Sequence, residues 1–171
     1  MLTLNQRTDA LANDSVTLVF DERKRCRLRV TLVSGREAGV FLERGDHLRG
    51  GDRLLAAEDG TVVEIVAAPE RLIEAVAESP LHLARAAYHL GNRHVPLQIL
   101  AQEAGGRLRF QVDHVLAEMV KGLGCAVTEI EAPFQPEPGA YRAHGHQTGD
   151  LHDPGHGLHR SMPKIHQFTP R

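Results

Sequence analysis

The sequence contains no tryptophan, only two cysteines and few aromatic residues, which make up 4% of its 171 residues. Cys26 and Cys125 lie far apart and form no CxxC pair, so we expect free thiols in a reducing compartment. No segment approaches the ~20 uninterrupted apolar residues that cross a bilayer. The N-terminus also lacks the basic start and apolar run of a signal peptide. We therefore expect a cytoplasmic protein with no membrane partner.

An excess of charge of either sign is also lacking, since the formal net charge is -2 at pH 7. Affinity for nucleic acids depends largely on concentrated lysine and arginine side chains, so we expect no nucleic-acid partner. The hydrophobic content of 42% and the length are those of a globular protein with one or two small domains. Histidine is abundant instead, with 11 residues, and this bias needs a chemical explanation.

Residues 1–68 are predicted to form an all-β domain. Leu28, Val30 and Leu32 alternate with polar residues, which is the period of a strand with one solvated face. Glycine-containing turns, such as the one at 59–60, separate the apolar segments. The predicted strands are Val16–Phe20, Arg27–Val33, a segment around Phe41, Arg53–Ala57 and Thr61–Ala68.

After Pro69 the apolar period becomes helical in two places. Ser79 and Pro80 form a typical helix start. The serine hydroxyl can cap a free backbone amide, and the missing N–H of proline costs nothing in the first turn, where that N–H would have no helical partner. Apolar residues at helical spacing continue to Leu90, and Gly91 is expected to end the helix in the left-handed conformation.

A hairpin is predicted over 95–112, with Gly105 and Gly106 as its turn. Asp113 is expected to cap a second helix, which ends before a strand over 125–132. Residues 71–78 complete a β-α-β-β-α-β order if they form a strand, although their periodicity is equally compatible with a helix. This order suggests a ferredoxin-like domain over 69–132, with both helices on one face of an antiparallel sheet. The predicted fold class is therefore α+β.

From residue 133 onward, proline, glycine and histidine replace the apolar pattern. Too little apolar surface remains to offset chain entropy, so we expect a flexible His-rich tail over 133–171. Neutral imidazoles are good ligands for nickel, copper, zinc and cobalt, so a His-rich tail indicates metal binding. The irregular spacing of the histidines in this tail argues against an expression tag. The tail histidines are His144, His146, His152, His156, His159 and His166.

Among the remaining histidines, His94 lies in a tight corner between the first helix and the hairpin, where a side chain can be held rigidly. One imidazole makes a poor metal site, but a two-fold axis would set His94 against its own copy. The first helix has a second apolar side, Leu81, Ala84 and Tyr88, which favours a dimer. A wider core-facing side explains the same pattern.

The other histidines of the predicted domains have less chemical context. His47 lies in a turn, and His82 and His89 share a helical face with Arg85, so all three are expected to be solvated surface residues. His114 lies in the first turn of the second helix, where the helix dipole mildly disfavours an imidazolium but accepts a neutral, ligating imidazole. A surface role is the favoured interpretation of His114 as well.

The segment 83–99, with its GNRH motif, resembles the UreE family of urease accessory proteins, as do 113–124, 131–141 and the His-rich end. The similarity runs through the whole chain, including the turns of 44–60. It implies an N-terminal β domain similar to a chaperone peptide-binding domain, followed by a ferredoxin-like metal-binding domain. It also implies a homodimeric nickel metallochaperone, not an enzyme, that delivers Ni(II) to apo-urease together with the GTPase UreG and the other urease assembly proteins.

Carried over to this sequence, the histidine of the GNRH motif is His94, the principal nickel ligand at the dimer interface. His114 matches the second histidine of an HxH pair found in some members, but Val112 replaces the first. Since Val112 fits the strand alternation as a core residue, we expect this peripheral site to be weakened or absent. The variable tail ligands are expected among His144, His146, His152, His156 and His159. Zn(II) or Cu(II) is also expected to bind.

Three other functions are compatible with parts of this pattern. An intracellular nickel or zinc buffer or storage protein would use the same histidines without delivery. An RNA-binding module needs exposed aromatics on the central strands, and Phe110 alone is insufficient. A hydrolase needs a nucleophile with a neighbouring base, and none is identifiable.

Overall fold

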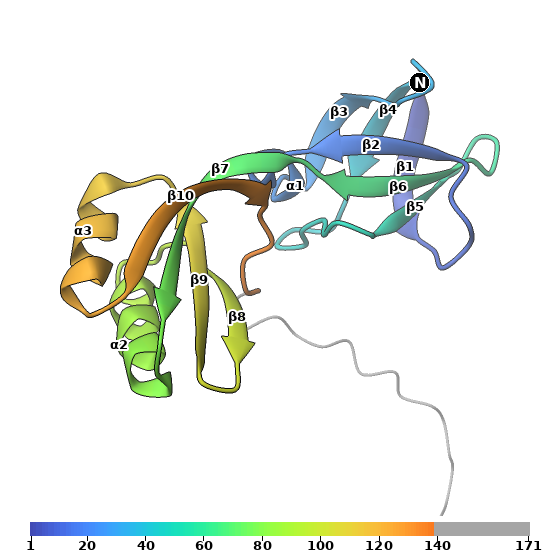
Figure 1. The fold of residues 1–171 in the computed structure, drawn as a ribbon. Coiled ribbons are helices and arrows are strands. Elements are labelled where there is room, and N and C mark those ends of the chain that lie inside the picture. Colours follow the sequence, from blue (N-terminus) through green and yellow to red (C-terminus); the bar gives the residue numbers. More distant parts are fainter. Residues whose placement is uncertain (139–171) are drawn as a thin grey trace, which may run out of the picture.

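The computed structural model describes residues 1–138 and contains two sheets, each with its own core (Figure 1). The α+β class predicted from the sequence is confirmed, and most elements are strands. Within residues 1–138, no helix is both long and apolar enough to span a membrane. The tail residues 139–171, with all of the tail histidines, lie outside the described residues.

The first sheet is six-stranded and nearly closes into a barrel, with the order β2-β6-β5-β1-β4-β3. The Val33 N–H donates to the Ser15 carbonyl (2.9 Å), which links the two ends of the sheet. Fully buried residues such as Leu4, Val40 and Ile65 fill its interior. Its elements are β1 (Leu2–Arg7), β2 (Asp14–Leu18), β3 (Arg27–Thr31), β4 (Glu37–Phe41), β5 (Arg53–Ala56) and β6 (Val62–Ala67), with a short helix α1 (Phe20–Arg23) between β2 and β3.

The second sheet is four-stranded and antiparallel, with the order β10-β7-β9-β8. Ile73 is paired with Phe110 on one face, and buried residues of both helices, including Leu90 and Val120, belong to the same core cluster. Both helices therefore cover one face of the sheet (Figure 1). The elements are β7 (Pro69–Ala77), α2 (Pro80–Gly91), β8 (Gln98–Gln102), β9 (Gly105–Gln111), α3 (His114–Gly122) and β10 (Ala126–Pro133).

Both predicted helix starts are confirmed by their caps. The Ser79 Oγ accepts a hydrogen bond from the His82 N–H (3.2 Å). The Asp113 carboxylate accepts from the N–H groups of Val115 (2.9 Å) and Leu116 (3.0 Å). The segment with ambiguous periodicity is the strand β7, which both β9 and β10 flank.

Two predictions about glycines were wrong. Gly91 ends α2 but is not left-handed, and the first residue after α2 with a positive φ is His94. Gly105 and Gly106 do not form the hairpin turn, because they begin β9 and residues 103–104 make the connection. Gly105 is needed for a different reason: a Cβ there would lie 2.1 Å from the carbonyl oxygen of Ala77.

The sequence predicts a flexible tail from residue 133 onward, but the folded part of the chain extends beyond that residue. Pro133 is paired in β10, and Phe134 is 0% exposed. The Phe134 ring meets the Phe20 ring of α1 edge-on, with centroids 5.2 Å apart. Residues 133–138 are thus part of the junction between the two sheets.

The close approach at Gly105 predicts a large cost for even one added carbon. Gly105→Ala should lower the free energy of unfolding by about 3 kcal/mol or more, because Cβ meets backbone and φ is +142°. The matched control is Gly91→Ala, where no atom lies within 4 Å and helix propensity favours alanine by up to about 1 kcal/mol. Urea denaturation measures both, and equal midpoints for the two variants would contradict this explanation.

Asp59 gives the first sheet a pH-dependent contribution to stability. The hydrogen bond from the Thr61 N–H (3.0 Å), together with those from Arg36 and the Thr61 hydroxyl, lowers the pKa of Asp59 from 3.8 to about 2. The depressed pKa means that this stabilisation is present above pH 3.8 and is lost as the pH falls toward about 2. Asp59→Asn should therefore lower the urea midpoint at pH 6, and the difference from the unmodified chain should shrink progressively below pH 4. A difference that stays constant down to pH 2 would disprove the linkage.

Candidate metal-binding groove

His94 lies on a tight turn that follows α2. The His94 N–H donates to the Gly91 carbonyl (2.9 Å), and the Arg93 and Val95 N–H groups both donate to the Leu90 carbonyl. The φ angle of His94 is +55°, the one positive value among the non-glycine residues of the described chain. The left-handed conformation costs roughly 1–2 kcal/mol for a residue with a Cβ, and such strain is concentrated at functional sites. The turn thus fixes the main chain at an exposed histidine.

This imidazole lines a groove of about 330 Å³ where the two sheets meet. The groove is lined by His47, Leu48 and Arg49 from the loop between β4 and β5, and by His94 and Val95 from the turn after α2. Residues 135–138 also line it. The groove therefore brings together three parts of the chain that are remote in sequence.

His47 was expected to be a solvated turn residue, yet it is partly buried in this groove. Its Nδ1 is buried and has no hydrogen-bond partner within residues 1–138. Its main chain is fixed, because its N–H donates to Asp46 Oδ1 (2.9 Å) and its carbonyl accepts from Arg7 (2.9 Å). No local sequence signal distinguishes His47, since only the packing of the two sheets brings it near His94.

The other predicted ligands are not gathered in the groove. His114 is exposed at the start of α3 and does not line the groove. Val112, which stands where an HxH pair would have its first histidine, is half-buried against the core of the second sheet, as predicted. Within the described part of the chain, no three His, Cys, Asp or Glu side chains are placed to hold a metal ion.

The second apolar side of α2 is solvent-exposed in the single chain. Leu81 is 57% exposed and Tyr88 is 65% exposed, and Ala84 between them is also exposed. The alternative that these residues widen the core-facing side of the helix is therefore wrong. The core contacts of α2 are made by the buried Ala86 and Leu90 and by the partly buried Leu83 and Ala87.

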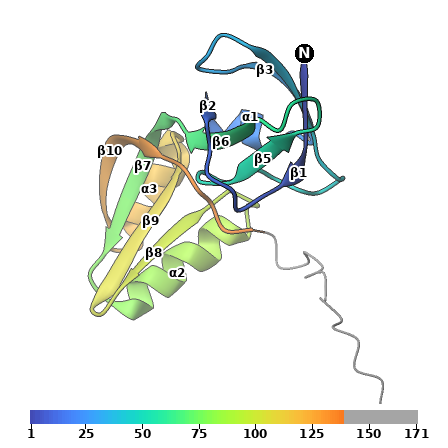
Figure 2. The ribbon, with the colours of Figure 1, turned by 90° about the vertical axis from the view of Figure 1, so that its right-hand side faces the viewer.

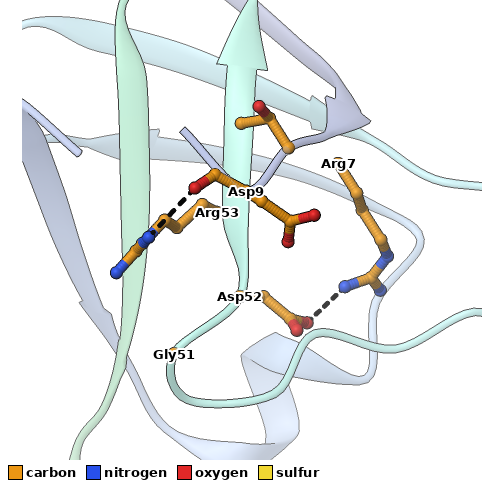
Figure 3. A pocket seen from close by; sticks show the side chains of 6 residues that line it. Arg7, Asp9, Gly51, Asp52 and Arg53 are labelled. Carbon is orange, nitrogen blue, oxygen red and sulfur yellow. Dashed lines mark hydrogen bonds and ion pairs between the residues drawn. The ribbon is translucent and has the colours of Figure 1, made fainter. Parts of the chain in front are cut away.

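A second, more polar cavity of about 260 Å³ lies in the first sheet (Figure 3). Arg7 Nη1 donates to Asp52 Oδ2 (2.5 Å), and Arg53 donates to the Asp9 carbonyl (3.4 Å). These contacts tie the loop around Gly51 to the end of β1. None of the predicted metal ligands lines this cavity.

Comparisons with known proteins agree along the whole chain. The family model described as the UreE urease accessory protein N-terminal domain matches residues 2–68, and the model of the C-terminal domain matches residues 70–163. The chain is 70% identical over 176 residues to the urease accessory protein UreE of Dechloromonas aromatica, with 100% of both proteins covered. It is 51% identical to that of Pseudomonas putida strain W619, covering 90% of this chain and 94% of the relative. For Citrobacter koseri the identity is 48%, covering 89% of this chain and 100% of the relative.

The two matched models and these relatives are all urease accessory proteins. The chain belongs to the UreE family.

The strain at position 94 can be measured without metal. Because glycine adopts a φ of +55° without a steric penalty, His94→Gly should be more stable than His94→Ala by about 1 kcal/mol. Urea denaturation of the two variants tests this difference, and a less stable glycine variant would show that the turn is unstrained.

Proposed function

We propose that this chain is a nickel metallochaperone for urease maturation, and that a homodimer binds Ni(II) between the two His94 side chains. The observation that carries the proposal is that the exposed His94 lies on a strained backbone turn and lines a groove. Membership of the UreE family supports the link to urease. The expected partners are UreG and the urease–accessory protein complex, and the proposed role is not catalytic.

The exposed apolar side of α2 supports dimer formation. Leu81, Ala84 and Tyr88 lie on one side of the helix that leads to the His94 turn. A two-fold axis near His94 would bury this side against its copy and bring two identical imidazoles together. Burial of these side chains would also stabilise the dimer through the hydrophobic effect, which two histidines alone would not do.

The division into domains belongs to the same proposal. We assign residues 1–68 to the peptide-binding-like domain and residues 69–132 to the ferredoxin-like metal-binding domain. Residues 133–138 belong to the junction between the sheets, so the tail is shortened to 139–171. The strand order β10-β7-β9-β8, with α2 and α3 on one face, supports the ferredoxin-like assignment. The near-closed first sheet supports a separate β domain.

The chemistry suits a metal that must be released as well as bound. Two imidazoles leave coordination positions open, and mixed nitrogen and oxygen donors suit Ni(II), with Zn(II) or Cu(II) also able to bind. Burial raises the pKa of the Cys125 thiol, which keeps it protonated and unsuited to be a thiolate ligand. Tail imidazoles would complete the shell at ~mM effective concentration, and each can leave without unfolding the protein.

A nickel or zinc buffer would use the same ligands but would not transfer the metal. The two functions are separated by urease activation in a reconstituted mixture at limiting nickel. Delivery predicts that activation requires this protein, whereas buffering predicts equal or lower activation when it is added.

The proposed role of His94 as core ligand can be tested by substitution. His94→Ala should abolish the tight nickel site in isothermal titration calorimetry, because each chain loses the fixed imidazole of the dimer axis. His114→Ala is the matched control and should leave the tight site unchanged, since His114 lies outside the groove. Unchanged tight binding in His94→Ala would overturn the assignment.

The proposed role of the tail can be tested by truncation. A chain ending at Pro138 should bind fewer nickel ions per dimer but keep the site at the His94 axis, as calorimetric stoichiometry can show. Ending the chain at Ala132 would be a poor test, because it removes the fully buried Phe134. Full stoichiometry without residues 139–171 would exclude tail ligands.

A further inference from the structure

We propose that the groove lined by His94 is also a binding site for a small organic acid, whose carboxylate is bound by Arg49 and whose carbon skeleton packs on the apolar part of the lining. This inference goes beyond the proposed function, because the acid binds to the protein itself and needs no metal. All residues of the site lie within the described range 1–138. Three features support it: a guanidinium without a partner, a buried ring nitrogen without a partner, and a preformed apolar wall.

Arg49 lines the groove with a guanidinium that is available to an anion. Its main chain is fixed, because its N–H donates to Asp52 Oδ2 (2.7 Å). The residue is exposed, and within residues 1–138 its side chain makes no hydrogen bond or ion pair. A guanidinium presents several N–H donors in one plane, which matches the two oxygens of a carboxylate. Arg49 therefore suits the charged end of an organic acid.

A second arginine strengthens the attraction for an anion. Arg23 also lines the groove, but its guanidinium is buried, donates only to main-chain carbonyls and is paired with Glu70 at 3.9 Å. Burial lowers the pKa of Arg23, and the charge of Arg49 lowers it as well, while nearby carboxylates partly offset this. The two guanidiniums are thus close enough to repel each other. Glu137, the one carboxylate of the groove lining, forms no ion pair with Arg49, so a bound anion would relieve this repulsion.

His47 provides the second polar feature of the lining. Its Nδ1 atom is buried and has no hydrogen-bond partner within residues 1–138. A buried polar atom without a partner is costly, and an imidazole nitrogen can donate to a carboxylate oxygen. His47 and Arg49 are two residues apart in the loop between β4 and β5. One carboxylate in the groove could therefore serve as the partner of both side chains.

Much of the remaining lining is apolar and suits a carbon skeleton. It includes one aromatic ring and three prolines from separate parts of the chain: Phe20, Pro96, Pro136 and Pro138. The volume of about 330 Å³ is at the lower end of the range of about 300–1,000 Å³ for ligand pockets, so the ligand must be small. An amphipathic acid fits this combination better than a purely inorganic anion does.

The wall formed by residues 135–138 is already in place without a ligand. Figure 2 shows this segment, in orange, crossing from the end of β10 toward the end of α2. The Glu137 N–H donates to the Leu97 carbonyl (2.8 Å), and the Gln135 side chain accepts from the Gly50 N–H (3.2 Å). These bonds join the segment to both sheets. Because the groove is preformed, binding a ligand there requires little ordering of the chain.

The polar cavity of the first sheet (Figure 3) provides a comparison within the same molecule. It also contains arginines, but Arg7 is paired with Asp46 (3.1 Å) and Asp52 (2.5 Å). Arg53 lies 4.0 Å from Glu64. These guanidiniums already have carboxylate partners, so we expect no organic acid to bind in that cavity.

Benzoate is the probe, because it joins one carboxylate to an apolar ring. Titration of the metal-free full chain, followed by NMR of the backbone amides, should give saturable shifts at Leu48, Arg49 and Val95. Amides of the polar cavity should not shift. Benzamide has nearly the same shape without the charge, and inorganic phosphate has charge without the skeleton, so each should bind at least about tenfold more weakly. No benzoate binding, or equally tight binding of benzamide or phosphate, would overturn the proposal.

Substitutions locate the site. Arg49→Gln should weaken benzoate binding at least about tenfold, because the charge-assisted hydrogen bonds are lost. His47→Leu should weaken it at least about threefold. Arg44→Gln is the matched control, since Arg44 is an exposed arginine of the same loop that does not line the groove. It should bind benzoate like the unmodified chain, and both arginine variants should share one urea midpoint.

Equal benzoate affinity in Arg49→Gln and Arg44→Gln would overturn the proposal, as would shifts confined to amides outside the groove. Either failure leaves the proposed nickel function intact, because no metal is present in these titrations.

Discussion

The strained turn after α2 is the constraint on which the proposed site depends. Three backbone hydrogen bonds to the carbonyls of Leu90 and Gly91 close this turn, and they leave His94 with a φ of +55°. A histidine on a flexible loop would lose conformational freedom each time it bound a metal. In this protein the turn fixes the backbone of His94 during folding. The entropy cost of ordering that backbone is therefore part of the folding free energy and does not reduce the free energy of metal binding. One fixed imidazole per chain is also too few for a stable site, which is why the proposed site needs a second chain.

The junction between the sheets connects this turn to the rest of the molecule. The segment Phe134–Pro138 makes hydrogen bonds with Gly50 on one side and with Leu97 and Gln98 on the other. The buried guanidinium of Arg23 donates to the Phe134 carbonyl. The groove at His94 therefore depends on the packing of both sheets and this segment. In this arrangement the first sheet contributes walls and anchoring, while the proposed ligands come from the second unit and the tail.

The sequence predicted those elements that carry their own local signals. Ser79 with Pro80, and Asp113, mark helix starts through contacts within three residues, and both caps are present. The GNRH motif singled out His94 before its geometry was known, and the structure shows that geometry to be unusual. The resemblance to the UreE family was confirmed over both matched domains.

The features that the sequence did not predict all depend on contacts between distant residues. Gly105 looked like a turn residue, but it is glycine because the end of β7 passes close to it. Phe134 looked like the start of a tail, yet it is buried by Phe20 and bonded by Arg23, more than 100 residues earlier. His47 joins the groove for the same reason. Periodicity cannot reveal such contacts, because it describes only neighbours along the chain.

The central claim is that one nickel ion is shared by two copies of His94. Nickel titration combined with light scattering tests it most directly, because scattering counts the chains while titration counts the tightly bound ions. The account predicts a dimer with one tight nickel ion per two chains. A protein that stays monomeric with and without nickel, and that binds one tight ion per chain, would contradict it.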